Sequence, residues 1–328
     1  MIIKTSHLIG SVKLPPSKSI LHRLLIAAAL SSEKSEISGV KLSDDITATI
    51  NGLTAMGTDF FLNDDIMTVT ALCKSDFAKI DCIESGSTLR FLMPICAALG
   101  INCEFSGIGR LPERPLNDYL RLFSEHNIKI DGIKLPIKLS GKLTPGRFEL
   151  PGNISSQFVT GLLFALPLLE EDSEIVLTSP LESKGYANMT IFVLKKFSIE
   201  IMQTETGYKI KGNQKYSSCN LYAEGDWSAA TFFMLAGALG GKIKLLNLSN
   251  ASCQSDMACF EVFKAFGAAT DKHENYISCK KGDLHGIKID ASEIPDMVPC
   301  IAAAAAMADG ITEIFGASRL RFKESNRI

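Results

Sequence analysis

An internal repeat constrains the fold of this chain more than any other sequence feature. Apolar helices rich in small residues are expected at regular intervals, and each begins with serine or aspartate, which are good helix N-caps. These helices are expected to start near Ser17, Ser85, Ser155, Asp226 and Asp296. Because the starts recur about every 70 residues, the pattern predicts several copies of one supersecondary unit.

Each copy also contains a second, more polar helix followed by a turn. The expected turns lie at Gly57, Asn127, Ser198 and Gly267. Glycine and asparagine suit the left-handed conformation that ends many helices. Short β-branched runs between the helices predict strands at Glu36–Val40, Glu174–Leu177 and Lys242–Leu246. The chain is therefore predicted to be an α/β protein whose repeat holds two helices and about four short strands. The first helix of each copy is apolar nearly all round and is expected to be buried on every side.

Composition and charge narrow the class of protein. A chain of 328 residues is expected to form two domains, and a formal net charge of −2 gives no basic field for nucleic acid. Neither a signal sequence nor a spanning helix is expected. The nine cysteines are odd in number and lack metal-ligand spacing, which favours a reduced, cytoplasmic protein.

Residues that could carry chemistry gather at the expected helix starts. They are Lys18, Ser19 and Arg23; Gly86 and Arg90; Arg110 and Arg114; Ser155, Ser156 and Gln157; Ser183 and Tyr186; and Asp296 with Arg321, Lys323, Glu324 and Arg327. Taken singly, each has a plainer interpretation as a cap or a surface ion pair. Together they suit two anionic substrates and a proton transfer, because helix starts and guanidinium groups bind anions. No Walker loop, dinucleotide fingerprint or zinc spacing is present.

The repeat period also bears on the end of the chain. A further polar helix would end about ten residues past Ile328, and another buried helix would follow. We therefore expect that a C-terminal part is missing, with a natural end at Ile328 as the alternative.

Eight ordered motifs carry a resemblance that covers essentially the whole chain. They are LPPSKSILHR, ESGSTLRFLMP, LPERP, PGNISSQF, ESKGY, EGDWSAA, IPDM and RFKESNR. With them the chain resembles the enolpyruvyl transferases, and among these the 5-enolpyruvylshikimate-3-phosphate synthase family. The resemblance implies a two-lobed inverse α/β barrel built from βαβαββ units. The first lobe would comprise residues 1–14 and 225–328, and the second lobe residues 15–224, with three units.

The reaction that the resemblance implies moves the enolpyruvyl group of phosphoenolpyruvate to the 5-hydroxyl of shikimate 3-phosphate and releases phosphate, by addition and elimination. The positions that match contacts to shikimate 3-phosphate are Lys18, Ser19, Arg23, Ser155, Ser156, Gln157, Ser183, Asp296 and Lys323. Those that match contacts to phosphoenolpyruvate are Lys18, Gly86, Arg114, Gln157 and Arg327. Asp296, Lys18 and Glu324 match the catalytic groups. Neither a metal nor an organic cofactor is implied, and a monomer without nucleic-acid or membrane partners is expected.

Two alternatives stay open at this point. The sister enzyme acting on UDP-N-acetylglucosamine usually has Lys-Asn where Lys18-Ser19 stands here, and a cysteine in the loop that corresponds to Arg110–Pro115. The other alternative is a truncated form that binds shikimate 3-phosphate without turnover, since family residues that grip phosphoenolpyruvate would lie past residue 328.

Overall fold

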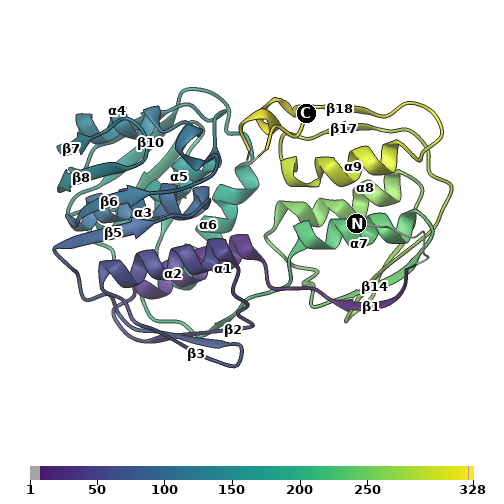
Figure 1. Cartoon of the computed structure of the whole chain (residues 1–328), viewed down its shortest axis with the longest axis horizontal. Helices are drawn as coiled ribbons and strands as arrows, with labels where there is room; N and C mark the ends of the chain where they lie inside the picture. Colours follow the sequence, from purple (N-terminus) through teal and green to yellow (C-terminus); the bar gives the residue numbers. More distant parts are fainter. Residues whose placement is uncertain (1–7, 324) are drawn as a thin grey trace. The chain divides into compact units, whose positions relative to one another are not determined.

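The computed structural model describes residues 8–323 and 325–328, with only the backbone described at Phe322. The chain forms two compact units. Unit 1 contains the described residues up to Ser17, with Glu224–Arg321 and Arg327–Ile328. Unit 2 contains Lys18–Ala223 and the described residues of Phe322–Asn326. Figure 1 follows the chain through both units.

Unit 2 holds three four-stranded sheets with one topology. Their strand orders are β13-β2-β4-β3, β5-β6-β8-β7 and, read from its other edge, β9-β10-β12-β11. In each sheet the first two strands pair in parallel and the later pairs are antiparallel. In the second and third sheets a helical segment joins the two parallel strands, while β13 of the first sheet comes from the far end of the unit. The last two strands of each sheet are joined by a short turn. This is the predicted βαβαββ unit.

The elements of unit 2 have the following bounds. The first unit comprises α1 (Lys18–Ala29), β2 (Ser35–Ser38), α2 (Asp44–Met56), β3 (Phe60–Asn63), β4 (Ile66–Val69) and the late strand β13 (Leu221–Tyr222). The second comprises β5 (Phe77–Asp81), α3 (Gly86–Leu99), β6 (Asn102–Ser106), η1 (Leu111–Glu113), α4 (Asn117–Glu125), β7 (Ile128–Asp131) and β8 (Ile137–Gly141). The third comprises β9 (Arg147–Leu150), α5 (Ser156–Ala165), η2 (Leu166–Leu168), β10 (Ser173–Leu177), α6 (Lys184–Lys196), β11 (Ile201–Gln203) and β12 (Gly207–Ile210).

Unit 1 repeats the same sheet once. Its order is β1-β14-β16-β15, and β1 pairs in parallel with β14. Its elements are β1 (Ile9–Lys13), α7 (Trp227–Ala238), β14 (Lys242–Leu246), η3 (Ser255–Ala258), α8 (Cys259–Ala265), β15 (Ala269–Lys272), β16 (Ile277–Lys280), β17 (Lys288–Asp290), η4 (Pro295–Met297), α9 (Val298–Ala305), β18 (Glu313–Phe315) and η5 (Ser318–Phe322). The parallel pair β17 and β18 flanks α9 in the sequence.

The predicted helix boundaries are largely confirmed. Helices α1, α3, α5 and α7 begin directly after Ser17, Ser85, Ser155 and Asp226, and the last three of these residues cap their helices. The turns at Gly57, Asn127, Ser198 and Gly267 all have positive φ. The fifth start differs, because Asp296 lies in the 3-10 turn η4 and does not cap α9. The segment Met1–Lys4, expected to enter a strand, lies outside the described residues.

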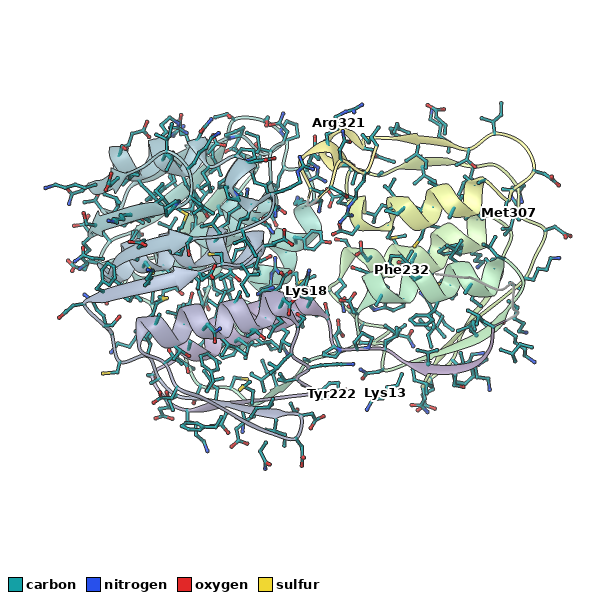
Figure 2. The ribbon with its side chains drawn as sticks, viewed as in Figure 1. Lys13, Lys18, Tyr222, Phe232, Met307 and Arg321 are labelled. Atoms are coloured by element: carbon teal, nitrogen blue, oxygen red, sulfur yellow. The ribbon has the colours of Figure 1, made fainter. Side chains whose placement is uncertain are left out.

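Burial of the first helices is confirmed for unit 2 and wrong for part of unit 1. Helix α3 is buried along almost its whole length and packs against α5. A Cβ on Gly161 would lie 2.2 Å from the Arg90 carbonyl oxygen, so only glycine permits this approach. In contrast, Phe232 on α7 is 58% exposed (Figure 2). Among the described residues of unit 1, α7 packs mainly against α8, α9, β14 and β16, and these elements do not cover Phe232.

Candidate active site

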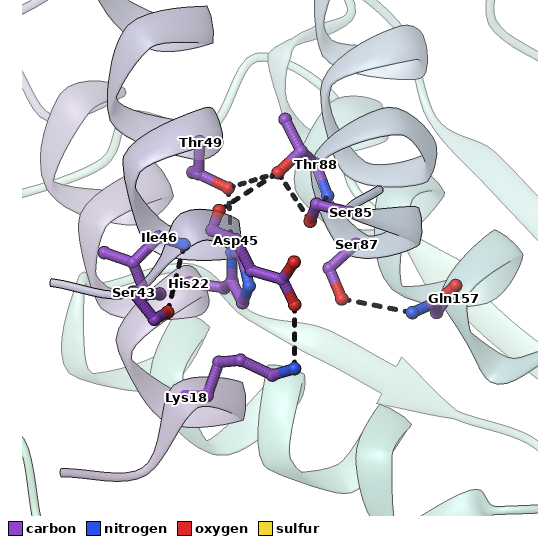
Figure 3. Close-up of polar contacts among 10 residues, drawn as sticks. All are labelled: Lys18, His22, Ser43, Asp45, Ile46, Thr49, Ser85, Ser87, Thr88 and Gln157. Atoms are coloured by element: carbon purple, nitrogen blue, oxygen red, sulfur yellow. Dashed lines mark hydrogen bonds and ion pairs between the residues drawn. The ribbon is translucent and has the colours of Figure 1, made fainter. Parts of the chain in front are cut away.

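The first cluster in unit 2 lies at the start of α1. The Lys18 ammonium donates to the Asp45 carboxylate of α2 at 2.7 Å, and both side chains keep access to solvent (Figure 3). Such an ion pair holds a flexible lysine in one direction without removing its charge. The contact between α1 and α2 therefore holds the Lys18 ammonium group beside the first turn of α1.

Arg23 lies deeper, one turn along α1, and is 3% exposed. Its Nε donates to the Thr190 hydroxyl of α6 at 2.9 Å. Its terminal nitrogens donate to the carbonyl oxygens of Ser19 and Tyr186 at 2.7 and 3.1 Å, and to the Thr160 hydroxyl of α5 at 3.4 Å. A buried guanidinium bonded to hydroxyl and carbonyl oxygens from three helices keeps one fixed orientation and suits an anionic ligand.

The second cluster surrounds the start of α3. Ser85 caps this helix by accepting a hydrogen bond from the Thr88 amide at 3.1 Å, and Gly86 is its first residue. A Cβ on Gly86 would lie 2.4 Å from Nη1 of Arg114 and 2.8 Å from Nη1 of Arg90. Two guanidinium groups therefore lie directly beside this helix start, and a larger residue at position 86 would displace them. Such a helix start is a suitable place for an anion.

Arg90 joins this cluster to the start of α5. It is 2% exposed and donates to Oε1 of Gln157 and to the Pro115 carbonyl oxygen, both at 3.0 Å. The Gln157 amide nitrogen then donates to the Ser87 hydroxyl at 3.1 Å (Figure 3). The structure therefore brings together Gly86, Arg114 and Gln157, which are three of the predicted ligands of phosphoenolpyruvate.

The predicted phosphate-binding hydroxyls lie at two other helix starts. The Ser155 hydroxyl caps α5 by accepting a hydrogen bond from the backbone N–H of Gln157 at 3.3 Å. Ser156, in the first turn of the same helix, is 6% exposed. Ser183 precedes α6 with a positive φ of 53° and makes no capping bond with its side chain. Lys323 is half-buried and belongs to unit 2.

Unit 1 holds two of the predicted residues, Asp296 and Arg327. The Arg327 guanidinium donates to the Asp296 carboxylate at 2.9 Å, and both side chains are about three quarters buried (24% and 28% exposed, respectively). Asp296 was expected to cap a helix, and this expectation is wrong because its carboxylate pairs with Arg327 instead. Glu324, the third predicted catalytic residue, lies outside the described residues.

Sequence reasoning missed one member of these clusters and undervalued another. Asp45 was not singled out, since an acidic pair in a first helical turn is common and its partner Lys18 is 27 residues away. Arg90 was noted beside Gly86 but was given no role, because its contact with Gln157 spans 67 residues.

No group of three histidine, cysteine, aspartate or glutamate side chains among the described residues could hold a metal ion. Within the same residues, no helix is long and apolar enough to cross a bilayer.

Comparison with solved structures defines the class of fold. EPSP synthase from Acinetobacter baumannii matches with a TM-score of 0.81 over 98% of this chain and 76% of that one, at 22% identity. The enolpyruvyl transferase NikO from Streptomyces tendae matches with a TM-score of 0.73 over 94% and 75%, at 15% identity. The predicted enolpyruvyl transferase fold is thereby confirmed.

Sequence comparison then gives the family. The sequence model of EPSP synthase (3-phosphoshikimate 1-carboxyvinyltransferase) matches residues 2–328. The 3-phosphoshikimate 1-carboxyvinyltransferase of Clostridium perfringens is 43% identical over 100% of this chain and 79% of its own length. That of Clostridium acetobutylicum is 45% identical over 97% and 76%. The chain belongs to the EPSP synthase family. The expectation of a missing C-terminal part stays a prediction, since a match over the whole of this chain does not test it.

Proposed function

We propose that this chain is a transferase that moves the enolpyruvyl group of phosphoenolpyruvate to the 5-hydroxyl of shikimate 3-phosphate, with release of phosphate. The observation that carries the proposal is the family match over residues 2–328. Both substrates of this reaction are anions, and the cations and helix starts of unit 2 are suited to binding anions. The UDP-N-acetylglucosamine reaction is not favoured, because the curated relatives described above carry the name 3-phosphoshikimate 1-carboxyvinyltransferase.

Shikimate 3-phosphate is assigned to the hydroxyls and cations of several helix starts. We assign its phosphate to Ser155, Ser156 and Ser183, whose hydroxyls and neighbouring backbone amides are donors at the starts of α5 and α6. Further contacts are assigned by position to Lys18, Ser19, Arg23, Gln157, Asp296 and Lys323. The fixed orientation of Arg23 supports its place in this set, since a preorganised guanidinium loses little freedom on binding.

Phosphoenolpyruvate is assigned to the cluster at the start of α3. Arg114 and the Gly86 amide supply a bidentate cation and a helix start, and Gln157 is held beside them by Arg90. Lys18 and Arg327 complete the assigned set. These charges would also stabilise the anionic tetrahedral intermediate, because fixed cations need little rearrangement as charge develops.

The proton transfers are assigned to Asp296, Lys18 and Glu324. Asp296 would take the proton of the 5-hydroxyl as the hydroxyl oxygen attacks the central carbon of phosphoenolpyruvate. Lys18 and Glu324 would protonate and deprotonate the methylene carbon. The methylene carbon gains a proton in the addition and loses one in the elimination, as the bond to phosphate breaks. The Arg327 guanidinium contacts the Asp296 carboxylate at 2.9 Å and fixes its position, which supports the assignment of Asp296 as the group that faces the 5-hydroxyl.

The test is turnover by the purified 328-residue chain. Incubation with both substrates should release phosphate and form a vinyl ether visible by proton NMR. Asp296→Asn should lower kcat by about 100-fold or more, which is the usual loss when a general base is removed. Lys18→Met should do likewise, and the matched control is Lys34→Met, which breaks a surface ion pair with Glu36. A wild-type chain that binds shikimate 3-phosphate but gives no product would establish the truncated, non-catalytic alternative.

We also propose that the two lobes predicted from the sequence, residues 1–14 with 225–328 and residues 15–224, are domains. The two compact units support this proposal, and limited proteolysis that cleaves within α3 or α7 before the connections near residues 14 and 224 would contradict it. The expected monomeric state and cytoplasmic location stay predictions.

A further inference from the structure

A chain of polar side chains crosses the interior of unit 2 from α1 to α3. Nδ1 of His22 lies 2.8 Å from the Thr49 hydroxyl of α2. The Thr49 hydroxyl lies 2.7 Å from that of Thr88 on α3, and Thr88 donates to the Ser85 hydroxyl at 2.8 Å. Figure 3 shows these four side chains in sequence. None of them is assigned a role in the proposed reaction.

These groups are removed from water. His22 and Ser85 are 1% exposed, and Thr49 and Thr88 are fully buried. Helices α2 and α3 approach closely here, since a Cβ on Gly52 would lie 2.6 Å from the end of the Leu92 side chain. A buried hydroxyl without a partner is costly, so each link of the chain depends on the next.

The proton of each link can be placed by counting. The Thr88 hydroxyl has one proton, and the Ser85 oxygen at 2.8 Å is a better acceptor than the Asp45 carbonyl at 3.4 Å. The short contact between Thr88 and Thr49 must then use the proton of Thr49. The contact between Thr49 and His22 must in turn use a proton on Nδ1 of His22.

This assignment agrees with the surroundings of His22. Its Nε2 is buried without a hydrogen-bond partner, which a lone pair tolerates better than an N–H would. Burial, with smaller effects of the Lys18 and Arg23 charges, lowers the pKa of His22 well below its ordinary value. A neutral ring with its proton on Nδ1 satisfies both observations.

The chain ends at the helix start that carries Gly86. Ser85 receives the Thr88 amide and hydroxyl together, and Gly86 follows it directly. We propose that His22, Thr49 and Thr88 are positioning residues that fix the start of α3 against α1 and α2, so that the Gly86 amide is held in place for phosphoenolpyruvate. This inference rests on the proposed function. Arg114, which packs on Gly86, depends on the same placement.

The first test needs no substrate. In the chain labelled with ¹⁵N-histidine, the His22 ring should be neutral at pH 7 with its proton on Nδ1, and Thr49→Val should shift the Nδ1 resonance. A ring that is charged at pH 7, or that carries its proton on Nε2, would overturn the proposal. Because this spectrum is independent of turnover, failure of the proposed function would leave its result standing.

The second test separates positioning from general stability. Thr88→Val keeps the shape but removes the hydroxyl, and should raise KM for phosphoenolpyruvate roughly tenfold with little change in kcat or in KM for shikimate 3-phosphate. Thr88→Ser should restore KM to within about twofold. Thr231→Val is the matched control, since this fully buried threonine of α7 belongs to unit 1, where its hydroxyl donates to the Trp227 carbonyl and contacts the Cys259 side chain of α8. An unchanged KM in Thr88→Val, or equal changes for both substrates, would refute positioning.

Discussion

Gly161→Ala tests the packing that places Arg90. Gly161 lies in α5 where it crosses α3, and an added Cβ would lie 2.2 Å from the Arg90 carbonyl oxygen and 2.3 Å from the Tyr119 hydroxyl. The first contact is with backbone and cannot be relieved by rotating a side chain. The second would displace a hydroxyl that lies 2.8 Å from the carbonyl oxygens of Arg90 and Phe158.

The magnitude follows from three contributions. Overpacking of a tight contact costs about 1–3 kcal/mol. Displacing the buried Tyr119 hydroxyl costs about 1–3 kcal/mol, because its one proton loses its buried carbonyl acceptor. Alanine favours a helix over glycine by about 1 kcal/mol, which offsets part of this loss. The net loss is about 3 kcal/mol, which lowers Tm by roughly 6–12 °C for a unit of about 200 residues.

The assay is thermal and urea unfolding followed by circular dichroism. Gly52→Ala in α2 is the matched control, since its nearest atom is the flexible end of Leu92 at 2.6 Å. We expect this control to change the free energy of unfolding by less than about 1 kcal/mol, because the leucine can turn away. The reasoning is refuted if Gly161→Ala unfolds at the wild-type temperature, or no lower than Gly52→Ala.

Three further predictions rest on buried groups. Tyr119→Phe should lower the free energy of unfolding by about 1–3 kcal/mol, measured by urea unfolding, and an unchanged midpoint would contradict it. The pKa of His22 is lowered on folding, so at low pH the unfolded chain binds a proton that the folded chain does not. The urea midpoint should therefore fall as the pH drops below about 6.5, and it should fall less in His22→Gln. Burial raises the pKa of the Cys300 thiol to about 11. A thiol reagent at pH 8 should therefore label the exposed Cys73 in the folded chain and should label Cys300 only after unfolding. Equal labelling rates for the two cysteines in the folded chain would contradict this prediction.

Much of the fold could be predicted from the sequence because its signals are local. A cap such as Ser85 acts within its own first turn, and a turn such as Asn127 needs only a residue that tolerates positive φ. Both signals repeat with the unit, so each copy supports the others. A helix does begin close to Asp296, at Val298, but the cap expected at Asp296 was wrong because a carboxylate can cap a helix or pair with a cation. The competing cation, Arg327, lies 31 residues away.

The site was only partly predictable for the same reason. The charged residues at helix starts could be found, but not the contacts that orient them. Asp45 meets Lys18, and Arg90 meets Gln157, only because separate helices pack together. The chain from His22 to Ser85 contains common residue types with no sequence pattern of their own. Such contacts follow from tertiary packing, which no local pattern encodes.

Isothermal titration with shikimate 3-phosphate tests the central claim most directly. The wild-type chain should bind this ligand saturably and should not bind UDP-N-acetylglucosamine. Absence of binding by a chain that circular dichroism shows to be folded, or saturable binding of UDP-N-acetylglucosamine instead, would contradict the assignment of this site.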